Sequence, residues 1–497
     1  MALAEARELL QSMEYLPASV RFDLAQEKLW TSLSAASRSF CWIASGKKSP
    51  GQMSFNEAFG RVWTNDPATL SAFASLTDES KAEALAFFTL LVHEYTHHFD
   101  FLITPFGVNY HGKWFREYRA FQRFAPLLLQ QPSFPDGRFI DYTPPTNASE
   151  EFREAFKEVH DISATLEALG DGGMTPRAEN MALGWYDNTK PAIILGQSLQ
   201  RITVRGFLFT YGVPDEPNWY LRPSTLLETR AIVHCLSWIL RLFGQDERAR
   251  EPMQIYLKAF YSRAAIAPDY RFLLDLLASA WETAFHNFLG NAHIELVRQF
   301  LMLLDAACWY ALQAPPPMPD ASAVRSSPIL RFVHAITFFV ESFRDRRPFA
   351  SAVDAMIAMD RDPKRTAYEL TGIDAILRYC VQFVEILQNL NHTEIIDPEI
   401  RKHFAHILRV QHNQLSSRVP KGYVSFIGIP EEGNPLLGLR TQQEVDDLAP
   451  DAYTSGSQIR DWFAFRNGLL YRFLGSQQIA VSLARFFNDP LRRASQA

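Results

Sequence analysis

The chain has 497 residues, of which 47 % are hydrophobic and 13 % aromatic, and its formal net charge is −6 at pH 7. This composition is typical of a globular protein with a sizeable core, and the acidic balance without a basic, aromatic-rich cluster argues against nucleic acid as a partner. No apolar run approaches the roughly 18 residues of a membrane span, and the N-terminus, with Glu5 and Glu8, does not resemble a secretory signal. We therefore expect a soluble, cytoplasmic protein without a membrane partner.

The four cysteines lie far apart in the sequence, and no two of them form a Cys-x-x-Cys pair. This spacing predicts neither a disulfide framework nor a zinc ribbon, and it favours reduced core residues of a cytoplasmic protein. They are Cys41, Cys235, Cys308 and Cys380.

In chain order, the hydrophobic pattern is mostly that of amphipathic helices. Residues 1–40 predict two helices broken near Pro17, and a looser Gly/Ser/Pro segment follows at 45–52. Further helices are predicted at 82–102, 114–130, 150–169 and 224–244, in long stretches up to 314, at 329–415 and in the tail from 457.

A small β component is predicted beside these helices. Runs rich in β-branched and aromatic residues, bounded by turn signals, predict short strands. These runs are 138–142, 192–195, 202–211 and 423–429. The proline-rich segment 314–319 cannot continue a helix and reads as a linker, so we expect two domains, 1–313 and a helical 329–497 of unknown role.

The segment 82–102 contains the pattern on which the functional interpretation depends. Its lead-in has good helix formers without Gly or Pro, Thr77 or Asp78 suits the N-cap, and Thr104-Pro105 marks the end. Within it runs His93-Glu94-Tyr95-Thr96-His97. On a helix the two histidines at i and i+4 project from one face, so both imidazoles can bind one metal ion.

Glu94 stands next to the first histidine but is turned away from it, where it can accept a proton from an attacking water. Two neutral nitrogens suit Zn²⁺, and a carboxylate kept off the metal suits a general base. The alternative interpretation is a buried histidine cluster that is satisfied without a metal. Against it, Glu94 is the only acid between Glu83 and Asp100, and a buried acid beside two imidazoles is costly without a partner.

This five-residue motif resembles that of the zincin metallopeptidases, over about 25 residues of the chain. The metzincin branch would require glycine at position 100 and histidine at 103, where this chain has Asp100 and Ile103. The resemblance is therefore to the gluzincins, and it implies a zincin-like peptidase core, a zinc cofactor and a third ligand from a downstream glutamate on a second helix.

Two glutamates compete for the role of third ligand. Glu117 has a spacing from His97 similar to that of the thermolysin relatives, but Lys113 at i−4 and nearby arginines explain it as a helix salt bridge. Glu228 is the only acid between Glu216 and Asp246, and its helical face is otherwise apolar, so a buried carboxylate there needs a partner such as a metal. We favour Glu228, although its distance along the chain is long for a gluzincin.

Other residues are candidates for supporting roles. Asp100 follows His93 by two helical turns and is expected either to orient a metal-binding histidine or to be a surface acid near the helix end. A peptidase also needs a donor to the developing oxyanion. The nearest candidates in the sequence, each equally explained as an aromatic core residue, are Tyr110, His111, Tyr118 and His234.

The function predicted from the sequence is a zinc-dependent hydrolase, most plausibly a metallopeptidase acting on a peptide or protein substrate. His93, His97 and Glu228 (alternatively Glu117) would bind Zn²⁺, and Glu94 would be the general base. The rival interpretations are a non-catalytic helical scaffold or interaction protein with a structural metal site, and a regulated protease effector in a defence or toxin system.

Overall fold

The computed structural model describes residues 33–44, 67–130, 143–144, 146–168, 223–243, 247–261, 294–316, 328–344, 349–367 and 369–419, together with Trp462. Over these ranges the chain is mostly helical and contains no strand, as the hydrophobic pattern predicted for its helical part. The predicted strands, residues 1–32 of the segment 1–40 in which two helices were predicted, and the tail from 457 apart from Trp462 lie outside the described residues.

The helices fall into a first group that surrounds α6 and a second group that follows the proline-rich segment. The first group is α3 (Ala35–Ala44), α5 (Pro67–Ala74), α6 (Asp78–Ile103), α7 (Pro105–Leu129), α8 (Glu150–Ala168), α11 (Pro223–Leu242), the short 3₁₀ turn η2 (Glu247–Ala249), α12 (Arg250–Tyr261) and α14 (Ile294–Leu312). The second is α15 (Pro328–Arg344), α16 (Ala352–Arg361), α17 (Lys364–Ala367), α18 (Ile373–Glu394) and α19 (Pro398–Arg418).

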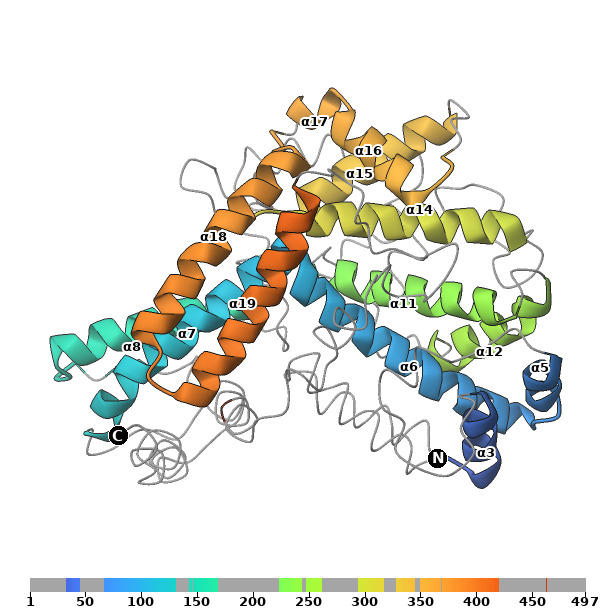
Figure 1. The fold of residues 1–497 in the computed structure, drawn as a ribbon, viewed down its shortest axis with the longest axis horizontal. Helices are drawn as coiled ribbons and strands as arrows, with labels where there is room; N and C mark the ends of the chain where they lie inside the picture. The colour runs from blue at the N-terminus through green and yellow to red at the C-terminus, as the bar shows by residue number, and fades with distance from the viewer. Residues whose placement is uncertain are drawn as a thin grey trace.

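Helix α6 is the central element. Its N-cap is Thr77, whose hydroxyl accepts a hydrogen bond from the Ser80 N–H at 3.2 Å, and its C-cap is Thr104, so the predicted boundaries are confirmed. It packs against α11 on one side and α7 on another, and α3, α12 and α19 also contact it (Figure 1). Since neighbours cover it on several sides, nearly every residue from Ala84 to Ile103 is at least partly buried.

The start of α7 differs from the prediction. The helix begins at Pro105 rather than near Trp114, because Thr104 ends α6 and also caps α7, accepting a hydrogen bond from the Gly107 N–H at 3.0 Å. Proline at the first helical position is favourable, since its fixed φ suits a helix and its missing N–H is not needed there. A Cβ on Gly107 would lie 1.9 Å from the Phe101 carbonyl oxygen, so only glycine permits this sharp corner.

The remaining helices stack on this pair. Figure 1 shows α11 beside α6, α14 beside α11 and α15 beside α14, while the α18–α19 pair lies across α7 and α6. One hydrophobic cluster includes residues from all of these helices. Helices of the second group thus contact those of the first directly, and the division into two domains stays a prediction.

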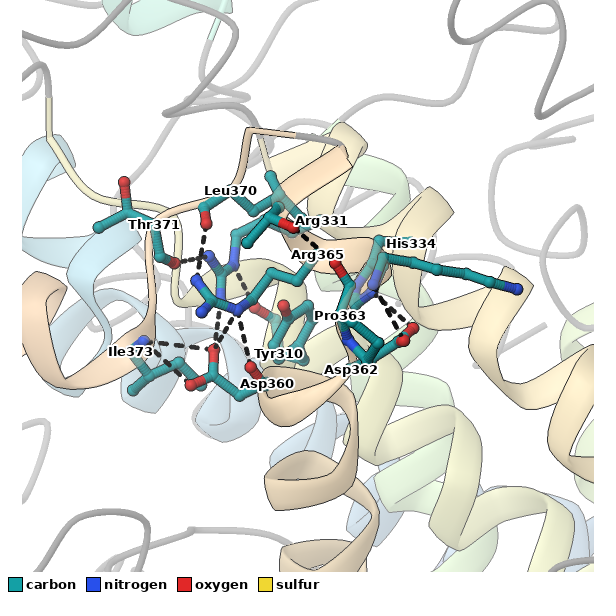
Figure 2. A network of polar contacts seen from close by, with 12 residues as sticks. Tyr310, Arg331, His334, Asp360, Asp362, Pro363, Arg365, Leu370, Thr371 and Ile373 are labelled. Atoms are coloured by element: carbon teal, nitrogen blue, oxygen red, sulfur yellow. Dashed lines mark hydrogen bonds and ion pairs between the residues drawn. The ribbon is translucent and has the colours of Figure 1, made fainter.

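A buried polar network fixes the second group of helices to α14 (Figure 2). The Arg331 guanidinium is fully buried and lies over the Tyr310 ring, 4.2 Å from its centroid. It donates hydrogen bonds to the carbonyl oxygens of Tyr310 (3.0 Å) and Thr371 (2.8 Å). Asp360 accepts from the Ile373 N–H at 3.3 Å and so caps α18 from another helix.

Two further predictions concern the cysteines and membrane-spanning helices. All four cysteines are buried and free of disulfides, as predicted. Among the helices within the described ranges, none combines the length and apolar character needed to cross a bilayer.

Candidate metal centre

The central feature of α6 is a cluster of three side chains, His93, His97 and Glu228, which we call the metal centre. The two Nε2 atoms lie 3.1 Å apart. Glu228, on α11, places Oε2 2.9 Å from His93 Nε2 and Oε1 3.3 Å from His97 Nε2. One ligand atom from each residue lies within 4.8 Å of the others, and this is the group in the described part of the chain that could hold a metal ion.

Local sequence explains why α11 presents Glu228 to α6. On the face of Glu228, Ala231, Ile232 and Cys235 are fully buried, as their i+3, i+4 and i+7 spacing predicted. Helix α11 packs against α6, and Cys235 of this stripe contacts the Thr89 carbonyl oxygen of α6 at 3.0 Å, so the face that carries Glu228 is turned toward α6. The side chains of His93 and Glu228 nevertheless keep 13 % and 18 % of their surface exposed, against 2 % for His97, so the centre is open to solvent on one side.

The three groups perturb one another strongly. Burial disfavours the protonated form of His93, but the Glu228 carboxylate, a hydrogen bond with Cys235 and the charge of Glu94 outweigh it and raise the pKa of His93 to about 10. Burial likewise disfavours the Glu228 carboxylate, yet the two imidazoles hold its pKa well below the ordinary value. The centre therefore carries a negative charge that is compensated by a cation, either a proton on His93 or a metal ion.

The spacing and the donor types of the group are those that could hold a metal ion. A tetrahedral zinc with bonds of about 2.1 Å separates its ligand atoms by about 3.4 Å. The two Nε2 atoms lie 3.1 Å apart, Glu228 approaches them through different oxygens at 2.9 and 3.3 Å, and one ligand atom from each residue lies within 4.8 Å of the others. Two imidazole nitrogens and one carboxylate oxygen are also a ligand set that zinc uses in catalytic sites with a fourth position left open.

Glu94 is buried, with 4 % of its surface exposed, and follows His93 directly on α6. It is not a member of the three-residue group. Glu117, the alternative third ligand, is buried on α7 and is not a member of the group either.

The sequence predicts Asp100 either as an orienting partner for a histidine or as a surface acid. The structure instead pairs its Oδ1 with Nη1 of Arg230 on α11. Burial, and to a lesser extent the charge of Asp305, raise the pKa of Asp100 to about 7, although Arg230 opposes this. Asp100 is thus part of an ion-pair cluster between helices and not a surface acid.

The structure places the proposed oxyanion donors in packed environments. The Tyr110 ring lies 4.2 Å from the Phe101 ring, and His111 Nδ1 lies 3.0 Å from the Gly107 carbonyl oxygen. His234 Nε2 lies 2.9 Å from Asp305 Oδ1, and burial lowers the pKa of His234. Tyr118 packs on Trp462, with ring centroids 4.9 Å apart.

Sequence reasoning missed three residues of this region. Cys235 contacts His93 and donates to the Thr89 carbonyl oxygen at 3.0 Å, while Arg230 and Asp305 form the ion pairs described above. For Asp305 a signal was present, because it is the only acid between Glu295 and Asp320 in an apolar helix. The same signal had singled out Glu228.

Comparison with known proteins assigns neither a family nor a function to the chain. No family model, curated protein or solved structure matches the chain.

Proposed function

We propose that this protein is a zinc-dependent hydrolase that acts as a metallopeptidase. One observation supports this best. Glu228 lies far along the chain from the His-Glu-x-x-His motif, yet its two carboxylate oxygens lie next to the two histidines of that motif. A third ligand of this type is what the resemblance to gluzincins requires, and Glu94, which is buried and follows His93 directly, is the residue that the motif assigns as general base.

In this proposal the residues of the chain have separate roles. His93, His97 and Glu228 hold the zinc, which when bound would polarise a substrate carbonyl and make water a better nucleophile near neutral pH. Glu94 accepts the proton from the attacking water and delivers it to the leaving amine, so it acts first as a base and then as an acid. Because the centre is exposed on the side of His93 and Glu228, a substrate would approach there.

The test compares four proteins for bound zinc and for cleavage of a mixed peptide pool. Wild type should bind one zinc and cleave. Glu94→Gln should keep the zinc and lose cleavage, because it removes the base but no ligand. Glu228→Gln should lose zinc. Glu117→Gln is the matched control, a buried glutamate outside the centre that should keep both properties.

The rivals give different results in the same experiment. A structural metal site predicts zinc in wild type, no cleavage, and loss of zinc in Glu94→Gln, since such sites normally have four protein ligands. If zinc is lost in Glu117→Gln and kept in Glu228→Gln, the ligand assignment is wrong. If wild type binds no zinc, the hydrolase proposal fails altogether.

A further inference from the structure

A cluster of charged side chains joins both helices of the metal centre to α14; we call Asp100, Arg230, His234 and Asp305 the buried charge cluster. Arg230 on α11 pairs through Nη1 with Asp100 on α6, and its Nε lies 2.9 Å from Asp305 Oδ1 on α14. His234 contacts the same Asp305 oxygen at 2.9 Å. All four side chains are buried.

This cluster lies close to the metal centre along both helices. Asp100 follows His97 by three residues on α6, and Arg230 follows Glu228 by two on α11. The Arg230 guanidinium also lies over the Trp309 ring, 4.4 Å from its centroid, so its plane is held from α14 as well. A planar guanidinium that serves two carboxylates has little freedom to adjust.

The contacts of Arg230 can form in only one axial register of α11 against α6. Sliding one helix past the other by a single residue moves its side chains by about 1.5 Å, enough to break a hydrogen-bonded ion pair. Glu228 moves as a unit with Arg230, since both belong to the same helix. The distance from Glu228 to the histidines is therefore coupled to the Arg230–Asp100 pair.

We propose that Arg230 is a positioning residue, which with Asp100 and Asp305 sets the register at which Glu228 meets His93 and His97. Buried ion pairs contribute little net stability compared with apolar packing, so a cluster of this kind is better explained by the geometry it specifies. Only the zinc-affinity measurement rests on the proposed function. The register of the two helices also exists in the metal-free protein and can be tested there.

The chain supplies a matched control. Arg331 is a second fully buried arginine that lies over an aromatic ring of α14 and faces an aspartate, but it belongs to the network of Figure 2 and not to the metal centre. Replacing either arginine by methionine keeps the length and apolar packing of the stem and removes a buried cation. Both replacements should therefore destabilise the fold similarly.

The experiment measures three quantities on wild type, Arg230→Met, Arg331→Met and Asp305→Asn. These are the thermal midpoint, the zinc affinity by chelator competition, and, in metal-free protein labelled with ¹⁵N-histidine, the ring signal of His93 assigned with His93→Gln. Asp305→Asn keeps the side-chain volume and weakens the contacts of this residue with Arg230 and His234, so it covers the case in which Arg230→Met does not fold.

Arg230→Met should weaken zinc binding at least about tenfold and displace the His93 signal, and Asp305→Asn should do the same to a smaller extent. Arg331→Met should lower the thermal midpoint and leave zinc affinity and the His93 signal as in wild type. The proposal is overturned if Asp305→Asn changes neither property, or if Arg331→Met changes both as much as Arg230→Met. If wild type binds no zinc, the proposed function fails and the His93 signal alone decides the positioning role.

Discussion

Zinc binding to the metal centre should release about one proton per ion near pH 7.5. In the metal-free protein the pKa of His93 is raised to about 10, so its imidazole is protonated at neutral pH and cannot bind a metal. With a pKa about 3 units above pH 7, only about one molecule in a thousand has a free Nε2, which costs about 4 kcal/mol of zinc affinity. The affinity should therefore rise about tenfold between pH 7 and pH 8.

Titration calorimetry in several buffers of different ionisation enthalpy measures the proton count directly. Glu94→Gln is the control, since it keeps all three ligands and removes the smallest of the contributions that raise the pKa of His93; it should still release close to one proton. Zinc that binds through all three residues without proton release between pH 7 and 8 would refute the reasoning. In that case Glu228 does not hold a proton on His93.

Three further predictions concern the surroundings of the centre. The pKa of Asp100 is raised to about 7 in the folded protein, so the stability that this residue contributes is complete below about pH 4 and is lost as the pH rises through 7. The free energy of unfolding of wild type relative to Asp100→Asn should therefore fall by up to about 1.4 kcal/mol per pH unit between pH 5 and 7. Urea titrations measure this difference, and a constant value would contradict the prediction. Gly107→Ala should destabilise the fold by more than about 2 kcal/mol, because the new Cβ would lie 1.9 Å from a backbone oxygen. The control is Gly372→Ala, whose Cβ would lie 3.3 Å from the end of an arginine side chain and should cost less stability. Equal thermal midpoints of the two variants would contradict the prediction. Cys235→Ala should lower the pKa of His93 and so strengthen zinc binding near pH 7 without changing the stoichiometry, because it removes a hydrogen bond that favours the protonated imidazole; unchanged affinity in chelator competition would contradict this.

The helices nearest the motif were predictable because their signals are local. The N-cap Thr77, the apolar lead-in and the stop at Thr104 act within a few residues, and α6 has the predicted boundaries. The start of α7 was misplaced for a physical reason. A single threonine caps both helices, and Gly107 is needed for the close approach of two backbones, which no periodicity records.

For the site, the sequence by itself determined the pair His93 and His97, because the i, i+4 spacing of a helix fixes their common face. It also marked Glu228 as an isolated acid on an apolar face and favoured it, but it left Glu117 as an alternative. Only the packing of α11 on α6 decided which carboxylate meets the imidazoles, since that contact joins residues far apart in the chain. The partners of Arg230 were likewise decided by tertiary structure, because three helices must meet before one guanidinium can serve two aspartates.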